Sequence, residues 1–126
     1  MGGHYKDLIA WQRAMDLVES VYKITDRFPR REMYSLVDQL RRAAVSVPSN
    51  IAEGQAHRSR REFLHFLQHS RGSLAEIETQ LLIAIRLHYV DQNSAAPILS
   101  QIAEVGRIVN GLAASLAPTS SSDQTD

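Results

Sequence analysis

The sequence predicts an all-α protein, an up-and-down four-helix bundle whose second helix is kinked at a proline. Apolar residues recur three and four positions apart through most of the chain, whereas no stretch alternates as a β-strand would. A length of 126 residues gives room for one hydrophobic core but not for two. We therefore expect one bundle domain over residues 1–116 and a disordered C-terminal tail over residues 117–126, which have nothing to bury.

The first predicted helix spans about residues 7–27. Asp7 is its predicted N-cap, because a carboxylate can accept hydrogen bonds from the free amides of a first turn. Phe28-Pro29 closes the helix, since the residue before a proline avoids helical backbone angles. The apolar residues of this helix form two adjacent stripes that together cover roughly 200° of its surface.

The second predicted helix spans about residues 31–55. Its apolar stripe resumes at Ile51 after Pro48, which predicts one helix kinked at the proline. Proline has no amide hydrogen, so the carbonyl of Ala44 loses its donor. Gly54 is predicted to end the helix. Three polar side chains near the kink offer groups that could bond the freed backbone: Ser46, Ser49 and Asn50.

The third and fourth helices have their own start signals. Ser59 followed by Glu62 is a capping box, which predicts a long helix over about residues 59–89. Asp91 or Ser94 caps the last helix, which runs to the start of the tail. Both helices carry an apolar seam of the kind that lines a bundle core.

The composition excludes several classes of protein. Without cysteine there is no disulfide framework and no thiol catalysis. No apolar run approaches the roughly 20 residues that span a bilayer, so we expect no membrane contact and a cytoplasmic location. The net charge is zero, yet residues 1–72 carry 12 Lys and Arg against 8 Asp and Glu, and residues 73–126 carry 2 against 6. The basic half fits either a polyanion-binding face or contact with acidic faces of neighbouring subunits.

The apolar surface exceeds what one bundle core can bury. Such a surplus usually marks a subunit interface, so the sequence predicts a homo-oligomer. The alternative is that the tail or a loop covers these side chains. The residues predicted for the interface are Leu17, Val21, Ile24, Phe28, Val45, Ile83 and Leu87.

Clustered arginines predict a surface that could bind nucleic acid. Arginine binds phosphate without reading bases, and no aromatic side chains are interleaved to stack them, so binding should be directed at the backbone. The alternative is a solvated rim with salt bridges between subunits. The residues predicted for this surface are Arg41, Arg42, Arg58, Arg60 and Arg61.

Two histidine patterns admit a chemical interpretation. His65 and His69 stand one helical turn apart, a spacing that can share a metal, but we favour a solvated or interface pair and expect no metal and no cofactor. Arg60 and His65 match a spacing found in some helical ribonuclease domains, with histidine as acid or base and arginine stabilising phosphate charge. Such a spacing is common by chance in an arginine-rich helix, so we expect no catalytic residue.

Polar residues at the predicted edges of the core need partners. We expect Asn50, Glu53 and Arg71 to form a network that joins the second helix to the third, with Glu53 bonded to Arg71. This network is interpreted as structural.

Several ordered motifs over about residues 5–90 resemble one known family. They are residues 5–12 (YKDLIAWQ), 21–29 (VYK to FP), 39–54 (QLRRAAVSVPSNIAEG) and 62–76 (EF to RGSLAE). The chain resembles the four-helix-bundle family associated with 23S ribosomal RNA intervening sequences. That resemblance implies a homopentamer around a central channel, and kinship with the accessory variability proteins of diversity-generating retroelements, which bind nucleic acid and a reverse transcriptase.

These observations favour a non-enzymatic oligomeric scaffold or adaptor for RNA or a ribonucleoprotein partner. The first alternative is a purely structural or protein-binding oligomer with no nucleic-acid role. The second is a helical ribonuclease that uses Arg60 and His65.

Overall fold

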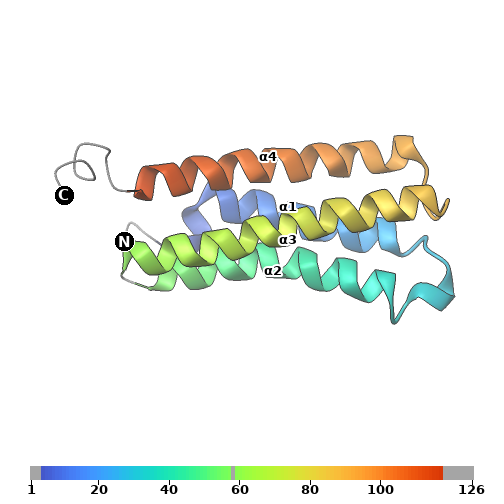
Figure 1. The fold of residues 1–126 in the computed structure, drawn as a ribbon, viewed down its shortest axis with the longest axis horizontal. Helices are drawn as coiled ribbons and strands as arrows, with labels where there is room; N and C mark the ends of the chain where they lie inside the picture. The colour runs from blue at the N-terminus through green and yellow to red at the C-terminus, as the bar shows by residue number, and fades with distance from the viewer. Residues whose placement is uncertain (1–3, 58, 118–126) are drawn as a thin grey trace.

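The computed structural model describes residues 4–57 and 59–117, and these residues form a four-helix bundle without strands. The helices run alternately up and down and lie side by side (Figure 1), which confirms the predicted fold class. Within the described ranges, no helix combines the length and apolar character that crossing a bilayer requires. The elements are η1 (Tyr5–Asp7), α1 (Ile9–Thr25), η2 (Arg30–Glu32), α2 (Leu36–Ala56), α3 (Arg60–Arg86) and α4 (Gln92–Leu116), where η marks a 3-10 helix.

Each helix packs against two neighbours in the cyclic order α1–α2–α3–α4, so among the described residues α1 and α3 lie at diagonal corners. The seams predicted for α3 and α4 point inward and fill the centre of the bundle. Burying a Leu or Ile side chain stabilises the fold by about 1.5–3 kcal/mol. The largest fully buried side chains include Leu17, Leu40, Ile51, Leu67, Ile77 and Leu81.

One stripe of α1 faces the core, and it is the stripe predicted for a subunit interface. Its members Leu17, Val21 and Ile24 are 0%, 1% and 4% exposed, and Phe28, just beyond the end of α1, is 7% exposed. That part of the interface prediction is wrong, because side chains inside the bundle cannot reach a neighbouring subunit. Ala10 and Ala14 extend the buried stripe, and their small side chains allow close packing of α1. The adjacent stripe, which includes Met15 and Tyr22, faces outward instead.

The predicted starts of the first two long helices are also corrected. Leu8 is the N-cap of α1, since Asp7 already belongs to η1. The chain from Arg30 to Glu32 forms η2, and α2 begins only after Ser35. A carboxylate oxygen of Glu32 accepts from the Ser35 hydroxyl at 2.7 Å and more weakly from the Leu36 amide at 3.4 Å, which ties η2 to the start of α2.

Two predicted caps are confirmed. The hydroxyl of Ser59 accepts from the amide of Glu62 at 3.2 Å, and a carboxylate oxygen of Asp91 accepts from the amide of Ser94 at 2.6 Å. The hydrogen bond from the Ser94 amide contributes most to lowering the pKa of Asp91. Both caps were predictable because donor and acceptor lie within one turn of the chain.

The end of α3 is earlier than predicted. His88 has a positive φ of 63°, so it leaves the helix that the sequence pattern extended through it. The amide of Tyr89 bonds to the carbonyl of Ala84 at 2.9 Å, and that of His88 bonds to the carbonyl of Ile85 at 3.0 Å. These two bonds define a Schellman motif, in which His88 holds the position that glycine usually takes.

Helix α2 continues through Pro48 to Ala56, so one helix through the proline is confirmed, whereas the predicted kink is not. The side-chain amide of Asn50 donates to the carbonyl of Ser46 at 2.8 Å. Across the interface, the Ser70 hydroxyl donates to the carbonyl of Val47 at 2.9 Å. The turn before the proline is therefore supported by side chains of both α2 and α3.

Gly54 does not end α2, contrary to the prediction. It is buried, and the helix runs two residues further. A Cβ at this position would lie 2.9 Å from both Cδ1 of Phe63 and Cβ of Phe66 on α3. Glycine at 54 therefore serves the close approach of α2 and α3 rather than termination.

Candidate assembly surface and arginine clusters

The outward stripe of α1 and the exposed side of α2 form one apolar surface, called here the α1–α2 face. Met15, Tyr22 and Val45 are each 41% exposed, which is high for large apolar side chains. The other members lie beside them. The α1–α2 face comprises Tyr5, Trp11, Met15, Val18, Tyr22, Met33, Tyr34 and Val45.

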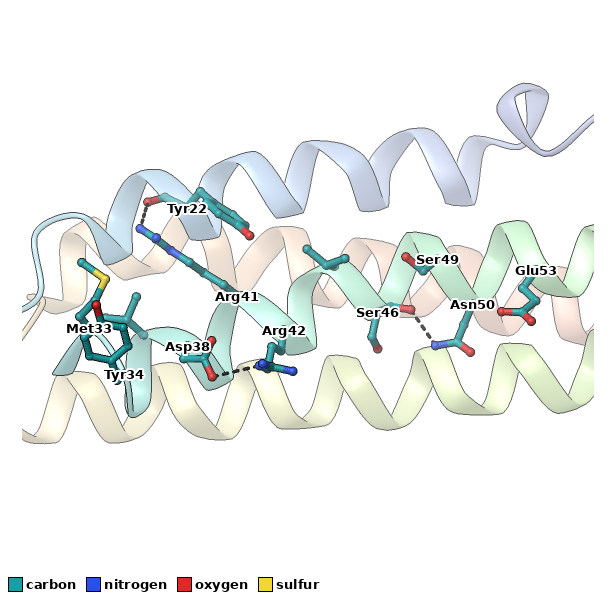
Figure 2. Close-up of a pocket in the computed structure, with 12 residues that line it drawn as sticks. Tyr22, Met33, Tyr34, Asp38, Arg41, Arg42, Ser46, Ser49, Asn50 and Glu53 are labelled. Carbon is teal, nitrogen blue, oxygen red and sulfur yellow. Dashed lines mark hydrogen bonds and ion pairs between the residues drawn. The ribbon is translucent and has the colours of Figure 1, made fainter.

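Two hollows lie along this face. The larger is a groove of about 700 Å³ over the outer side of α2, and Figure 2 shows Tyr22 of α1 on one side of it. The smaller, about 310 Å³, lies between Trp11 and Met15 of α1 and Pro48 of α2. Val45 and Ser49 line both hollows, so the hollows are contiguous. A polar rim runs along the groove and includes Asp38, Arg42, Asn50 and Glu53.

The structure brings Met33 and Tyr34 to this face. Tyr34 is 95% exposed, and Met33 is 41% exposed. Both lie between η2 and α2, where the chain is not α-helical. The helical period therefore could not assign their orientation. The sequence feature that could indicate their exposure is local, because Met33 and Tyr34 stand among charged and polar residues in the segment RREMYS.

Arg41 is held inside the fold, unlike a free nucleic-acid contact. Its Nε donates to the hydroxyl of Thr25 at 2.9 Å, and one terminal nitrogen lies 2.9 Å from a carboxylate oxygen of Asp26. The guanidinium lies 4.5 Å from the centre of the Tyr22 ring. The side chain is 21% exposed, so Arg41 links α2 to the last turn of α1.

Arg42 is different, because its side chain is 80% exposed. It pairs with Asp38 one turn earlier at 2.9 Å, an exposed contact that contributes little to stability. Its guanidinium can leave this pair for another anion at small cost. Arg42 therefore remains available on the rim of the groove.

Arg60 and Arg61 are exposed at the start of α3, and within residues 4–57 and 59–117 their side chains make no ion pair or hydrogen bond. Arg58 lies outside the described residues. Because α2 and α3 are antiparallel, Arg60 and Arg61 lie beside the end of α2. They are about 20 Å along the bundle from Arg41 and Arg42. The structure thus places the four described arginines of the predicted surface in two separate pairs rather than in one cluster.

The predicted polar network does not form. Asn50 bonds to the backbone of its own helix, as described above, and Glu53 lines the groove on the outer side of α2. Arg71 lines a separate hollow between α3 and α4. Glu53 and Arg71 face different grooves, and among the described residues no ion pair joins them, so this prediction is wrong.

A second apolar area lies on α3. Ile83 and Leu87, both predicted for the interface, are 42% and 51% exposed. Leu82 beside them is 45% exposed. Because α3 is diagonal to α1, this area is separate from the α1 part of the α1–α2 face.

The carboxylate of Glu32 accepts hydrogen bonds at the end of the bundle that holds η2. The Tyr89 hydroxyl donates to a carboxylate oxygen of Glu32 at 2.7 Å. The hydrogen bond from Ser35, followed by the one from Tyr89, lowers the pKa of Glu32. The same bond raises the pKa of Tyr89, because it holds the phenolic proton. The bond to Glu32 joins the segment after α3 to η2, and Tyr89 also packs against Phe28, which precedes η2.

Comparison with known proteins places these features in context. The model of the 23S rRNA-intervening sequence protein family matches residues 6–111. Among solved structures, the chain is similar to a protein of unknown function from the S23 ribosomal protein family of Bacteroides thetaiotaomicron, with a TM-score of 0.75 and 18% identity. The match covers 83% of this chain and 98% of that one. No curated protein sequence matches.

Proposed function

The chain belongs to the 23S rRNA-intervening sequence protein family, and we propose that it acts as a non-enzymatic oligomeric scaffold. The observation that carries this proposal is the α1–α2 face with its groove of about 700 Å³. A groove that combines apolar side chains with a polar rim resembles the anatomy of a protein interface. The occupant proposed for it is a second copy of this chain.

Two separate apolar areas favour a closed ring over a simple dimer. A twofold dimer buries the same patch on both subunits, whereas a head-to-tail contact joins two different patches and can close into a ring. The α1 part of the α1–α2 face and the area around Ile83 and Leu87 on α3 stand on diagonal helices and supply two such patches. A pentamer, which the family resemblance implies, is the ring proposed.

The ring is proposed to act as an adaptor for RNA through its arginines. Arg60 and Arg61 support this role best, because their side chains form no ion pair among the described residues. Arg42 supplies a further exposed cation, at the rim of the groove. Arg41 is assigned to folding instead, because Thr25, Asp26 and Tyr22 occupy its guanidinium.

Salt dependence separates this role from a purely structural one. Fluorescence anisotropy of a labelled structured RNA should give an affinity that falls steeply with salt, because phosphate contacts release counterions. Arg60→Ala combined with Arg61→Ala should weaken binding and reduce the salt slope. Arg86→Ala removes an exposed arginine at the opposite end of α3 and supplies the matched control. Failure of the wild-type ring to bind RNA would favour the purely structural or protein-binding scaffold.

The ribonuclease alternative is less favoured by the geometry of α3. At 3.6 residues per turn, Arg60 and His65 project about 140° apart around the helix, so they do not converge on one phosphate. His65 instead lies beside His69. RNA cleavage that is abolished by His65→Ala would restore this alternative.

A further inference from the structure

The strongest unassigned cluster lies on α3, at the end of the bundle where α2 ends. His65 and His69 are both exposed, and their Nε2 atoms lie 3.2 Å apart. The ring planes are nearly perpendicular, at 89°, with centroids 4.7 Å apart. The two nitrogens therefore converge on the same small volume at the helix surface.

This separation matches the geometry of two imidazoles on one metal ion. Zinc–nitrogen bonds are about 2.0–2.1 Å long, and two such bonds at a tetrahedral angle place the nitrogens about 3.3–3.4 Å apart. The one-turn spacing of the histidines is what lets a helix present both rings together. Little movement of either ring is needed to admit an ion.

Neighbouring rings hold this arrangement. Phe66 packs edge-on against His65, with centroids 5.7 Å apart and planes at 74°, and lies 6.4 Å from the centroid of His69. The ring of His57 stacks on Phe66 at 5.1 Å. Contacts of this kind restrict ring rotation and lower the conformational entropy lost when a ligand binds.

We propose that His65 and His69 form a chelating site for a divalent transition-metal ion that prefers imidazole, such as zinc, copper or nickel. Among the described residues no group of three or more His, Asp or Glu side chains is placed to hold an ion, so water completes the coordination. A site of this type is an open surface site rather than a closed structural one.

The proton balance of the site is simple. In the metal-free pair, one Nε2–H donates to the other Nε2. Two neutral imidazoles form this hydrogen bond only when one of the two Nε2 atoms carries a proton and the other does not. When the ion binds, the donor ring keeps one proton but carries it on Nδ1, which frees Nε2 as a ligand. No proton leaves the pair. The ion replaces the shared hydrogen bond.

The sequence alone favoured a solvated or interface pair at this position. The convergence of the two Nε2 atoms, which residue spacing cannot specify, changes that preference. The neighbouring charges oppose each other, because Arg61 stands four residues before His65 and Glu62 stands three before it. Cation binding is therefore left mainly to the imidazoles.

Isothermal titration of zinc chloride into the full-length protein, free of any affinity tag, tests the site. The expected result is one ion per chain, with no binding of magnesium, which prefers oxygen ligands. His65→Ala and His69→Ala should each weaken zinc binding at least tenfold, while His88→Gly, at the opposite end of α3, leaves it unchanged. These histidines are exposed, so circular dichroism should show the same helix content in every variant.

A relocated histidine supplies the matched control. His69→Ala combined with Gly72→His keeps two histidines on α3 but separates them by about 10 Å along the helix. A Cβ at position 72 meets nothing within 4 Å, so this change is tolerated. It should bind zinc as weakly as His69→Ala alone. Zinc affinity that survives His65→Ala, or that the relocated pair retains, would overturn the proposal.

Discussion

Gly54 of α2 and Phe63 of α3 meet so closely that a Cβ at position 54 would lie 2.9 Å from Cδ1 of the ring. Gly54→Ala should therefore destabilise the protein by about 1–3 kcal/mol, because neither helix can move away without losing core contacts. Gly72→Ala, where an added Cβ meets nothing within 4 Å, should be stabilising by up to about 1 kcal/mol through helix propensity. Urea unfolding of both variants measures the change in the free energy of unfolding. Equal changes in the two variants would show that position 54 is not closely packed.

Arg41→Ala should destabilise the bundle by about 1–2 kcal/mol, since it removes the hydrogen bond to Thr25 and the contact with the Tyr22 ring. Arg41→Lys should not restore stability, because an ammonium lacks the planar fork. Arg42→Ala is the matched control and should cost less than about 1 kcal/mol, since its ion pair is exposed. Thermal unfolding of the three variants measures the difference. Equal losses at both positions would contradict the structural role given to Arg41.

His88→Gly should stabilise the protein by about 1 kcal/mol. The positive φ of 63° at this position costs a residue with a Cβ more than it costs glycine. Guanidinium unfolding measures the change, with His57→Gly as a control outside the left-handed region. A loss of stability in His88→Gly would mean that the imidazole makes a contribution larger than the backbone strain.

The stability of the protein should depend on pH through Glu32. Hydrogen bonds from Ser35 and Tyr89 lower its pKa in the folded state, so its contribution is present above the unfolded pKa and is lost as pH falls through the folded pKa. Glu32→Gln should flatten the decline in melting temperature below about pH 4.5. Glu53→Gln, at an exposed carboxylate with no ion pair among the described residues, should leave the decline unchanged. An identical acid profile in wild type and Glu32→Gln would contradict this account.

The caps at the starts of α3 and α4 were predictable from sequence, whereas features that depend on the packing of two helices were not. The caps at Ser59 and Asp91 join atoms three residues apart, and both are confirmed. The choice between the two apolar stripes of α1 is made by the helices that pack on it, so Leu17 was assigned to the wrong surface.

The arginines follow the same rule. The partners of Arg41 are 15 and 16 residues earlier, on another element, and no local pattern indicates them. Gly54 was interpreted as a helix end because glycine is common there, yet the ring of Phe63 explains its presence. Exposure of Ile83 and Leu87 could be predicted because both stand outside a single, well-defined seam.

The mass of the protein in solution tests the proposed scaffold most directly. Light scattering at micromolar concentration should give a multiple of the 14.1 kDa chain for the wild type. Val45→Arg places a charge on the α1–α2 face and should dissociate the assembly, whereas Ser100→Arg, on the exposed side of α4, should leave it intact. A wild-type protein that remains at 14.1 kDa, or an assembly that survives Val45→Arg unchanged, would contradict the assignment of this face.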